Sequence, residues 1–310
     1  MRCGWGRGLN WARNGHLSEC DPSGRQKIGY EYEYESLKPF TGEMFAMFLP
    51  RLTKECFGIL ARERALTSVR PSSDLAAGNY FGMPSSIAFS NYLEVFQNSP
   101  IAHYILNSFK VTIPTVLGVV ALSCLTGFAL GVYKFRANLL IFFMFVAGNF
   151  VPFQILMVPV RDITLQLGLY NSSLGLILFH VAFQTGFCTL FMRNFIRALP
   201  FELIEVARVE GVAEWRIFWF VVLPLMRPAI AALSVLIFTF IWNDYFWATV
   251  LTTSADTQPV TAGLYSLNGQ WIAAWHLISA GSIVAALPPV AMFFLMQKHF
   301  IAGLTLGAVK

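Results

Sequence analysis

One short polar segment holds half of the charge in the second part of this chain. Nine of the eighteen charged residues after position 100 fall between Arg193 and Pro228, and long apolar segments enclose them on both sides. Within it, Glu205 and Arg208 could form charge-assisted hydrogen bonds with a partner protein. The alternative is an intrahelical pair at i,i+3, which contributes only about 0.2–0.5 kcal/mol. The chemistry that this segment suggests is therefore recognition.

A second candidate is Asp244, the one acidic side chain inside an expected membrane span, which Asn243 precedes. An ionisable group at membrane depth is costly unless it is paired or solvated. Asp244 is therefore expected either to face a water-filled cavity, or to form a structural hydrogen bond with a neighbouring helix. The residues alone leave both alternatives open.

The sequence offers no chemistry of its own beyond these two places. It contains no GxxxxGK[ST] segment that could cradle the phosphates of a nucleotide. No catalytic constellation, metal site or cofactor site is expected. The five cysteines show no paired metal spacing: Cys3, Cys20, Cys56, Cys124 and Cys188.

Turn and cap residues predict the elements that position the polar segment. Pro200 opens a helix, and Glu202 lies in its first turn, where a carboxylate complements the helix dipole. Gly211 provides a C-terminal stop. A second short helix is predicted over Ala213–Val222, closed by Pro224. The segment should therefore form a helix–glycine–helix elbow outside the membrane.

The rest of the chain has the composition of an integral membrane protein. It is 56% hydrophobic and 13% charged, with a mean hydropathy of +0.57. A membrane span needs about 20 mostly apolar residues. We therefore predict an all-α membrane protein with five clear transmembrane helices. These lie near Val111–Val132, Asn138–Val160, Leu174–Met192, Ala229–Leu251 and Ile278–Met296.

The net charge of +5 indicates orientation rather than nucleic-acid binding, because no basic–aromatic motif accompanies it. Lys134 and Arg136 lie in one connection, the arginines of the elbow in another, and Lys298 and Lys310 near the C-terminus. These are alternate connections, and basic connections face the cytoplasm. The elbow and the C-terminus are therefore predicted to be cytoplasmic.

Three regions follow from composition. Residues 1–64 are an atypical leader without a span, and we hypothesise that they are non-native, from a misassigned start or a frameshift. Residues 65–105 are expected to form an extracytoplasmic segment. Residues 106–310 should form the transmembrane domain, with the cytoplasmic loop at 193–228.

From about Ala65 to Lys310 the chain resembles the permease subunits of ATP-binding-cassette (ABC) importers, in particular the carbohydrate-uptake, maltose-type, binding-protein-dependent branch. That family has a cytoplasmic loop with Glu-Ala-Ala, three residues, Gly, nine residues, and then Ile, any residue, Leu-Pro. Val206 and Val221 replace the first Ala and the Ile. The matching residues are Glu205, Ala207, Gly211, Leu223 and Pro224. Trp242-Asn243-Asp244 and the tail Phe300–Lys310 are also similar to the family.

The resemblance implies a type I importer permease fold, normally with six spans, so that the first span is missing or degraded here. It implies that the loop docks on cytoplasmic ABC ATPase subunits, and that Asn243 and Asp244 lie along the translocation pathway. A second permease subunit, an extracytoplasmic solute-binding protein and membrane lipid are the other expected partners, in the inner membrane of a bacterium or archaeon. The expected coupling residues are Glu205, Ala207, Arg208, Gly211, Leu223 and Pro224.

Two alternatives remain at this stage. A self-sufficient secondary carrier would ordinarily need more intramembrane ionisable residues than Asp244 and would not need the elbow. A damaged, non-functional permease is the other alternative, suggested by residues 1–60. The solute is a sugar or a related compound if the resemblance holds, and the sequence does not specify it further.

Overall fold

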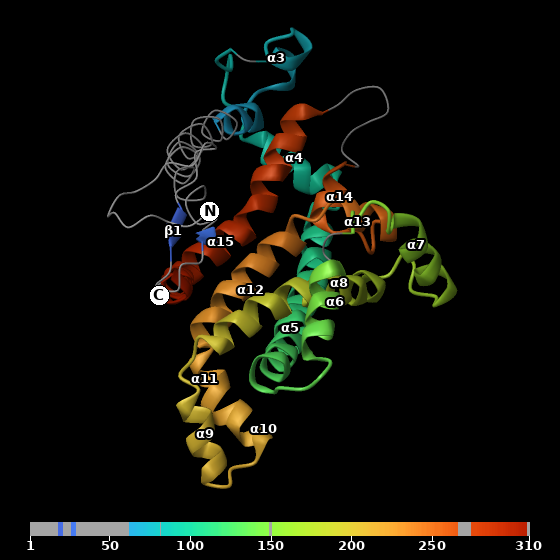
Figure 1. Cartoon of the computed structure of the whole chain (residues 1–310). Coiled ribbons are helices and arrows are strands. Elements are labelled where there is room, and N and C mark those ends of the chain that lie inside the picture. Colours follow the sequence, from blue (N-terminus) through green and yellow to red (C-terminus); the bar gives the residue numbers. More distant parts are fainter. Residues whose placement is uncertain are drawn as a thin grey trace. The chain divides into compact units, whose positions relative to one another are not determined.

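The computed structural model describes residues 18–20, 26–28, 62–80, 82–148, 151–265 and 274–308. The chain divides into two compact units, Met1–Glu63 and Arg64–Lys310. In the first unit, strands β1 (Ser18–Cys20) and β2 (Gln26–Ile28) pair antiparallel. The described residues of the second unit form helices and connections (Figure 1). The non-native origin of residues 1–64 stays a hypothesis, since most of them lie outside the described residues.

Three described helices are long and apolar enough to cross a membrane: α5 (Ile101–Val132), α8 (Ser173–Arg197) and the part Trp275–Met296 of α15 (Trp275–Ala308). A bent pair of shorter helices raises the number to at most four within the described part of the chain. The prediction of five spans is therefore not confirmed. Three of the predicted spans fall inside α5, α8 and α15.

The predicted span Asn138–Val160 is wrong as a continuous helix. The chain forms α6 (Asn138–Gly148), then turns, and then a separate helix α7 (Met157–Gln166). Pro152 falls between the two helices, and a proline has no N–H to continue a helical ladder. Neither piece is long enough to cross the hydrocarbon alone, because about 20 residues are required.

The predicted span Ala229–Leu251 is also interrupted. Helix α12 (Arg227–Trp242) ends at Asn243, and α13 (Phe246–Leu251) and α14 (Val260–Tyr265) follow as short helices. Asp244 accounts for the break, because its side chain accepts hydrogen bonds from backbone N–H groups of α13. Such local side-chain bonds compete with continuation of a helix.

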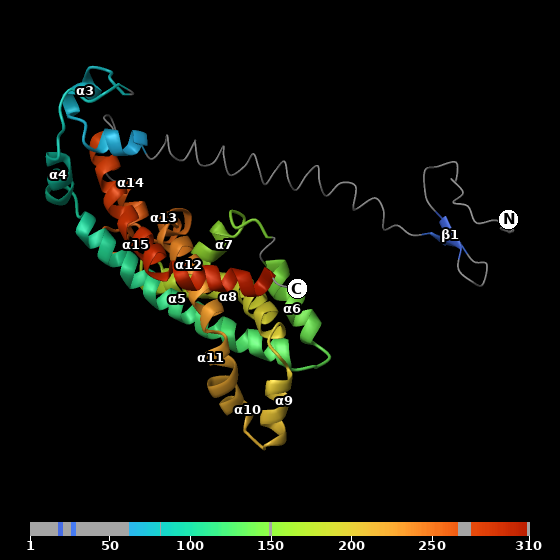
Figure 2. The ribbon, with the colours of Figure 1, turned by 90° about the vertical axis from the view of Figure 1, so that its left-hand side faces the viewer.

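The long helices pack side by side around two apolar clusters, and both Figure 1 and Figure 2 show α5, α8, α12 and α15 as one bundle. Helices α5 and α8 approach closely at Gly127, where an added Cβ would lie 2.9 Å from the Cβ of Met192. Across the bundle, the indole N–H of Trp242 donates to the carbonyl of Ala285 at 2.9 Å. The indole is buried, so this bond satisfies its donor.

The region before α5 is held by its own polar contacts. Residues 62–68 are helical, and α3 (Ser72–Ala76) and α4 (Ser90–Asn98) follow. The buried guanidinium of Arg70 donates to the carbonyls of Asn79 and Gly82. The hydroxyl and the backbone N–H of Ser85 donate to Asp74 and hold the pKa of that carboxyl below its usual value. The extracytoplasmic location of this segment stays a prediction.

Candidate functional site

The predicted elbow is present at one end of the second unit, formed by α9 (Glu202–Val209), Gly211 and a second helical arm (Figure 1). Gly211 has a φ of +79°, and its N–H donates to the carbonyl of Arg208 at 3.0 Å. An L residue in this left-handed conformation costs about 1–2 kcal/mol. Gly211 is therefore required for the sharp reversal between the two arms, as the spacing predicts.

The predicted end of the second arm is wrong. Pro224 was expected to close a helix over Ala213–Val222, but helical backbone continues through α10 (Glu214–Arg216), the π-helix η2 (Ile217–Val222) and α11 (Leu223–Leu225). Pro224 is the second residue of α11, which directly follows the π-helix, so helical backbone continues across it as far as Leu225. The chain then turns by 74° between Glu214–Leu225 and α12. Leu223 and Pro224 thus link the elbow to the bundle.

An ion pair joins the two arms across Gly211. The Nε of Arg208 donates to Glu214 Oε1 at 2.6 Å, and the Tyr133 hydroxyl donates to Glu214 Oε2 at 2.7 Å. The Arg208 guanidinium also lies 5.7 Å from the centre of the Tyr133 ring. Glu205 is not the partner of Arg208, so the intrahelical pair considered above does not form. Arg208 positions the elbow against the end of α5.

The two faces of α9 differ in burial. Ile204 and Ala207 point into the bundle and pack in the main apolar cluster. On the outer face, Val206 is 58% exposed and Val209 88% exposed. Glu205 lies beside them and is also exposed. The outer face therefore offers an apolar strip edged by a carboxylate, which suits an apolar cleft of a partner with a basic rim.

Asn243 and Asp244, the two residues predicted to line the translocation pathway, lie at the break between α12 and α13. Asp244 accepts from the N–H groups of Trp247 at 3.3 Å and Ala248 at 3.0 Å, and its Oδ2 lies 3.4 Å from Nε2 of His180 in α8. Asn243 is exposed and donates to the carbonyl of Thr239 at 2.8 Å. Asp244 thus makes structural hydrogen bonds and also lies at a cavity.

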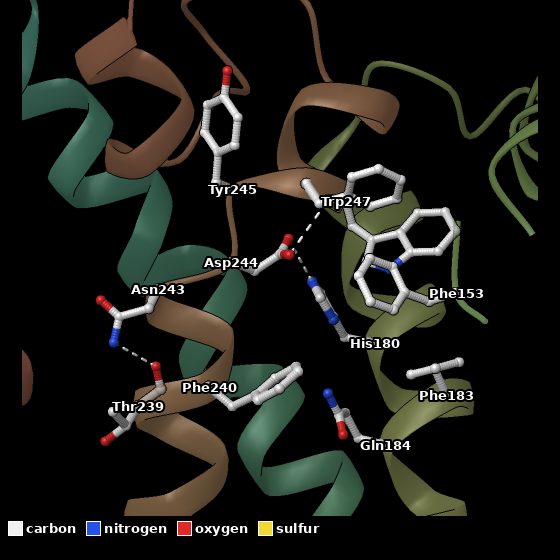
Figure 3. A pocket seen from close by; sticks show the side chains of 11 residues that line it. Phe153, His180, Phe183, Gln184, Thr239, Phe240, Asn243, Asp244, Tyr245 and Trp247 are labelled. Atoms are coloured by element: carbon white, nitrogen blue, oxygen red, sulfur yellow. Dashed lines mark hydrogen bonds and ion pairs between the residues drawn. The ribbon is translucent and has the colours of Figure 1, made fainter. Parts of the chain in front are cut away.

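That cavity has a volume of about 430 Å³, and Figure 3 shows side chains from α8, α12 and α13 directed toward it. Gln184 is buried, and its amide nitrogen has no hydrogen-bond partner among the described residues. Aromatic faces beside amide and carboxylate groups suit a polyhydroxylated molecule. The lining residues are Phe153, His180, Phe183, Gln184, Thr239, Phe240, Asn243, Asp244, Tyr245, Phe246 and Trp247.

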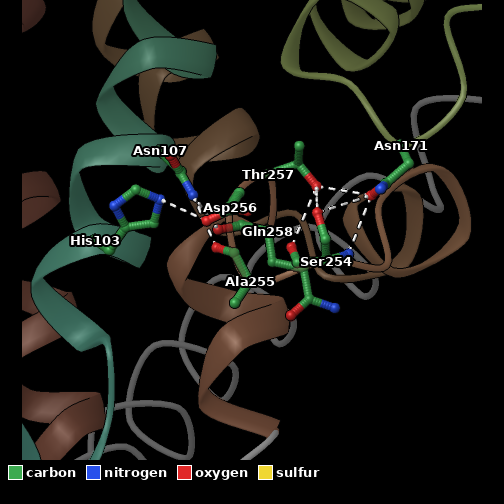
Figure 4. A network of polar contacts seen from close by, with 8 residues as sticks. All are labelled: His103, Asn107, Asn171, Ser254, Ala255, Asp256, Thr257 and Gln258. Atoms are coloured by element: carbon green, nitrogen blue, oxygen red, sulfur yellow. Dashed lines mark hydrogen bonds and ion pairs between the residues drawn. The ribbon is translucent and has the colours of Figure 1, made fainter.

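A polar network secures the end of the second unit opposite the elbow (Figure 4). Asn171, which has a φ of +55°, precedes α8, and its Oδ1 accepts from the N–H groups of Thr253 at 2.8 Å and Ser254 at 3.0 Å. The hydroxyl of Thr257 donates to the same oxygen at 2.8 Å. We call this group, Asn171 with Thr253, Ser254 and Thr257, the polar clasp. It fixes the loop between α13 and α14 to the start of α8.

Two residues of α5 extend the clasp. The amide of Asn107 donates to the carbonyls of Ala255 at 3.3 Å and Gln258 at 3.2 Å. The hydroxyl of Ser108 accepts from the N–H of Val260 at 2.8 Å. The sequence does not predict the clasp, since its partners are far apart along the chain. Among the described residues, no group of three or more His, Cys, Asp or Glu side chains could hold a metal ion.

Comparison with known proteins adds to this geometry. The profile of the family described as "Binding-protein-dependent transport system inner membrane component" matches residues 123–305, which include the elbow and the cavity-lining residues of α8, α12 and α13. Among curated proteins, the osmoprotective compounds uptake permease protein GgtD of Synechocystis is 33% identical over 252 residues, which cover 79% of this chain and 85% of that protein.

A further curated relative and a solved structure are also similar to most of this chain. The arabinooligosaccharides transport system permease protein AraQ of Halalkalibacterium halodurans is 32% identical over 248 residues, covering 79% of this chain and 88% of that protein. A chain from the crystal structure of a bacterial ABC transporter for the import of alginate superposes with a TM-score of 0.70 at 20% identity. The superposition covers 88% of this chain and 100% of the other, and it shows a shared fold.

Proposed function

We infer a carbohydrate importer function for this chain, which belongs to the family of binding-protein-dependent transport system inner membrane components. The chain is a multi-pass membrane protein and the permease subunit of an ABC importer. It is not itself an enzyme, because a separate subunit of such importers hydrolyses ATP. Family membership favours the importer over the self-sufficient secondary carrier.

The elbow is the proposed contact with the ATPase subunits, and one observation carries this assignment. Its outer face exposes Val206 and Val209 to solvent, although each could have been a polar residue at no cost to the bundle. Apolar side chains that protrude from a membrane bundle favour a protein partner. Glu205 adds a charge at the edge of the strip, while Ala207 packs inward to support it.

Rigidity lets the elbow transmit movement. Gly211 sets the reversal, the Arg208–Glu214 pair ties the arms together, and Leu223 and Pro224 connect the second arm to α12. A displacement of α9 by closing ATPase subunits would therefore move α12 as a rigid body. The cavity at Asp244 lies at the far end of α12, so the same movement reaches it.

The cavity is the proposed part of the solute pathway in this subunit. Asn243 and Asp244 line it, and His180 and Gln184 extend the polar lining. A buried amide without a partner, as at Gln184, is costly unless a ligand or water satisfies it. A sugar hydroxyl would accept this hydrogen bond, and the aromatic rings would contact its C–H faces.

The proposed solute is a sugar, an oligosaccharide or a related polyhydroxylated compound. The relatives named above are uptake permeases for osmoprotective compounds and arabinooligosaccharides, and the superposed transporter imports alginate. The proposed partners are cytoplasmic ATPase subunits, a second permease and an extracytoplasmic solute-binding protein. The proposed location is the inner membrane of a bacterium or an archaeon.

The function is tested by reconstituting the importer in proteoliposomes and measuring ATP-dependent uptake of labelled oligosaccharides. Uptake should require the ATPase and the solute-binding protein. Gln184→Ala should lower uptake while the ATPase remains bound to the complex. Uptake that continues without the ATPase would support a secondary carrier instead, and the absence of any insertion of this chain would support a damaged permease.

A further inference from the structure

A second cavity, of about 540 Å³, lies where the end of α5, the start of α6 and the last turns of α8 meet. Four cationic side chains line it, and no carboxylate does: Lys134, Arg136, Arg193 and Arg197. We call this cavity the basic pocket. It is separate from the solute cavity and from the outer face of α9, and the proposed function assigns it no role.

Arg193 is the informative member of the basic pocket because it is only 8% exposed. Its Nε donates to the carbonyl of Leu130 at 3.2 Å, and its guanidinium lies 4.0 Å from the centre of the Phe142 ring. Within the described part of the chain, no carboxylate lies within 4.0 Å of Arg193 or of the other three cations. A buried charge without a counter-ion is unfavourable, so the pocket favours an anion.

The arrangement suits a phosphate group. Guanidinium groups bind phosphate oxygens through paired N–H donors, and lysine adds a mobile point charge. Arg136, Arg197 and Lys134 are exposed at the pocket and could close around a group that enters it. The concentration of four positive charges would strongly favour a phosphate over a neutral headgroup.

The surface beside the basic pocket indicates which kind of ligand fits, a free anion or a lipid. Helix α6 starts at the pocket, and its outward face exposes a continuous set of large apolar side chains. These are Leu139, Leu140, Phe143 and Met144. A ligand with a phosphate head and hydrocarbon chains would satisfy both the cations and this face at once, whereas inorganic phosphate would satisfy only the cations.

The position of the pocket agrees with a lipid. In both Figure 1 and Figure 2 the connection between α5 and α6 lies toward the end of the second unit that carries the elbow. The distribution of basic residues predicts that this end is cytoplasmic. Anionic lipids attract basic side chains at that surface, by about 1 kcal/mol for each Lys or Arg in general.

We propose that the basic pocket binds the phosphate of an anionic phospholipid, whose acyl chains lie along the exposed apolar face of α6. Tyr133 also lines the pocket, and its hydroxyl donates to Glu214 of the elbow. The bound headgroup is therefore one side chain away from the ion pair that joins the arms of the elbow. Lipid occupancy would stabilise the elbow in the position in which the ATPase meets it.

The test measures lipid binding to the assembled importer by native mass spectrometry after delipidation in detergent. Palmitoyl-oleoyl phosphatidylglycerol is compared with phosphatidylcholine of the same chains and with inorganic phosphate. The test variant is Arg136→Gln with Arg197→Gln, since both side chains are exposed and Arg193 is spared. The matched control is Arg216→Gln with Arg227→Gln, two exposed arginines outside the pocket.

We expect wild type and control to prefer phosphatidylglycerol, and the test variant to bind it roughly 10- to 30-fold more weakly. Equal binding of the two lipids, or no change in the test variant, would overturn the proposal. Binding of inorganic phosphate as tight as that of phosphatidylglycerol would overturn the lipid assignment in favour of a soluble anion. No binding of either lipid to the assembled importer would also overturn the proposal.

Discussion

The elbow and the polar clasp lie at opposite ends of the second unit and are stabilised in opposite ways. The elbow depends on Gly211 and one ion pair, and it exposes Val206 and Val209. The clasp directs four donors from Thr253, Ser254 and Thr257 to one oxygen of Asn171, and Asn107 satisfies two further carbonyls of the same loop. The difference supports the proposal that the elbow binds a partner, whereas the polar bonds of the clasp are made within this chain.

The largest effect is expected from Val209→Asp. A carboxylate on the apolar strip would be buried at the interface without a partner, so association with the ATPase should weaken by about 100-fold or more. Binding of the purified ATPase to the permease in nanodiscs measures this. The matched control is Ile87→Asp, which places the same charge on a side chain that is 69% exposed in the segment before α5. Equal loss in both variants would contradict a specific role for the elbow.

The second effect concerns the clasp. Asn171→Ala removes the acceptor of four donors and leaves an alanine at a positive φ, so the free energy of unfolding should fall by about 2–4 kcal/mol. Denaturant unfolding in mild detergent measures it, with ATPase binding as a second readout. Asn98→Ala, which removes one exposed helical hydrogen bond, is the control. Unchanged stability would contradict the stabilising role of the clasp. A selective loss of ATPase binding would contradict the assignment of that contact to the elbow alone.

A third change compares two glycines with nearly equal backbone conformations. Gly211 has a φ of +79° and Gly78 a φ of +80°, and neither has a heavy atom within 4 Å of an added Cβ. Gly211→Ala and Gly78→Ala should therefore cost a similar free energy of unfolding, about 1–2 kcal/mol. Only Gly211→Ala should also weaken stimulation of ATP hydrolysis by the solute-binding protein. If both changes weakened that stimulation to a similar extent, the turn at Gly211 would have no specific role in coupling to the ATPase.

The smallest effect is expected from Glu214→Gln. The Arg208–Glu214 pair is partly exposed, so its loss should cost only about 0.5–1 kcal/mol. Because the pair joins the two arms, hydrogen exchange of the amides in α9 should nevertheless become faster. Glu210→Gln, an exposed carboxylate without an ion pair among the described residues, should leave exchange unchanged. The same acceleration in both variants would show that the pair does not hold the arms together.

The two ends also differ in how far the sequence predicts them. Local spacing predicts the first helix of the elbow and its reversal at Gly211, since Pro200 and Gly211 lie within a few turns of each other, but it misses the continuation of the second arm past Val222. The bonds of the clasp join residues 82 to 152 positions apart, between polar residues of loops that carry no periodic pattern. Composition likewise predicts a membrane bundle. However, two of the five predicted spans, Asn138–Val160 and Ala229–Leu251, are longer than the helices that form there.

Those two errors have a physical origin in single residues. Hydropathy averages over a window, so it does not register Pro152, which separates α6 from α7, or Asp244, whose side chain bonds the backbone of α13. The cavity near Asp244 was predicted only through Asn243 and Asp244 themselves. His180 and Gln184 come from α8, more than 50 positions earlier, and only the packing of α8 against α12 and α13 brings them to the same place.

The most direct test of the central claim is hydrogen–deuterium exchange of the permease in nanodiscs with and without the ATPase. The ATPase should slow exchange in residues 202–212 by about tenfold or more, while residues 252–260 at the clasp stay unchanged. Slower exchange at the clasp with an unaffected elbow would contradict the claim that the outer face of α9 is the surface completed by the ATPase.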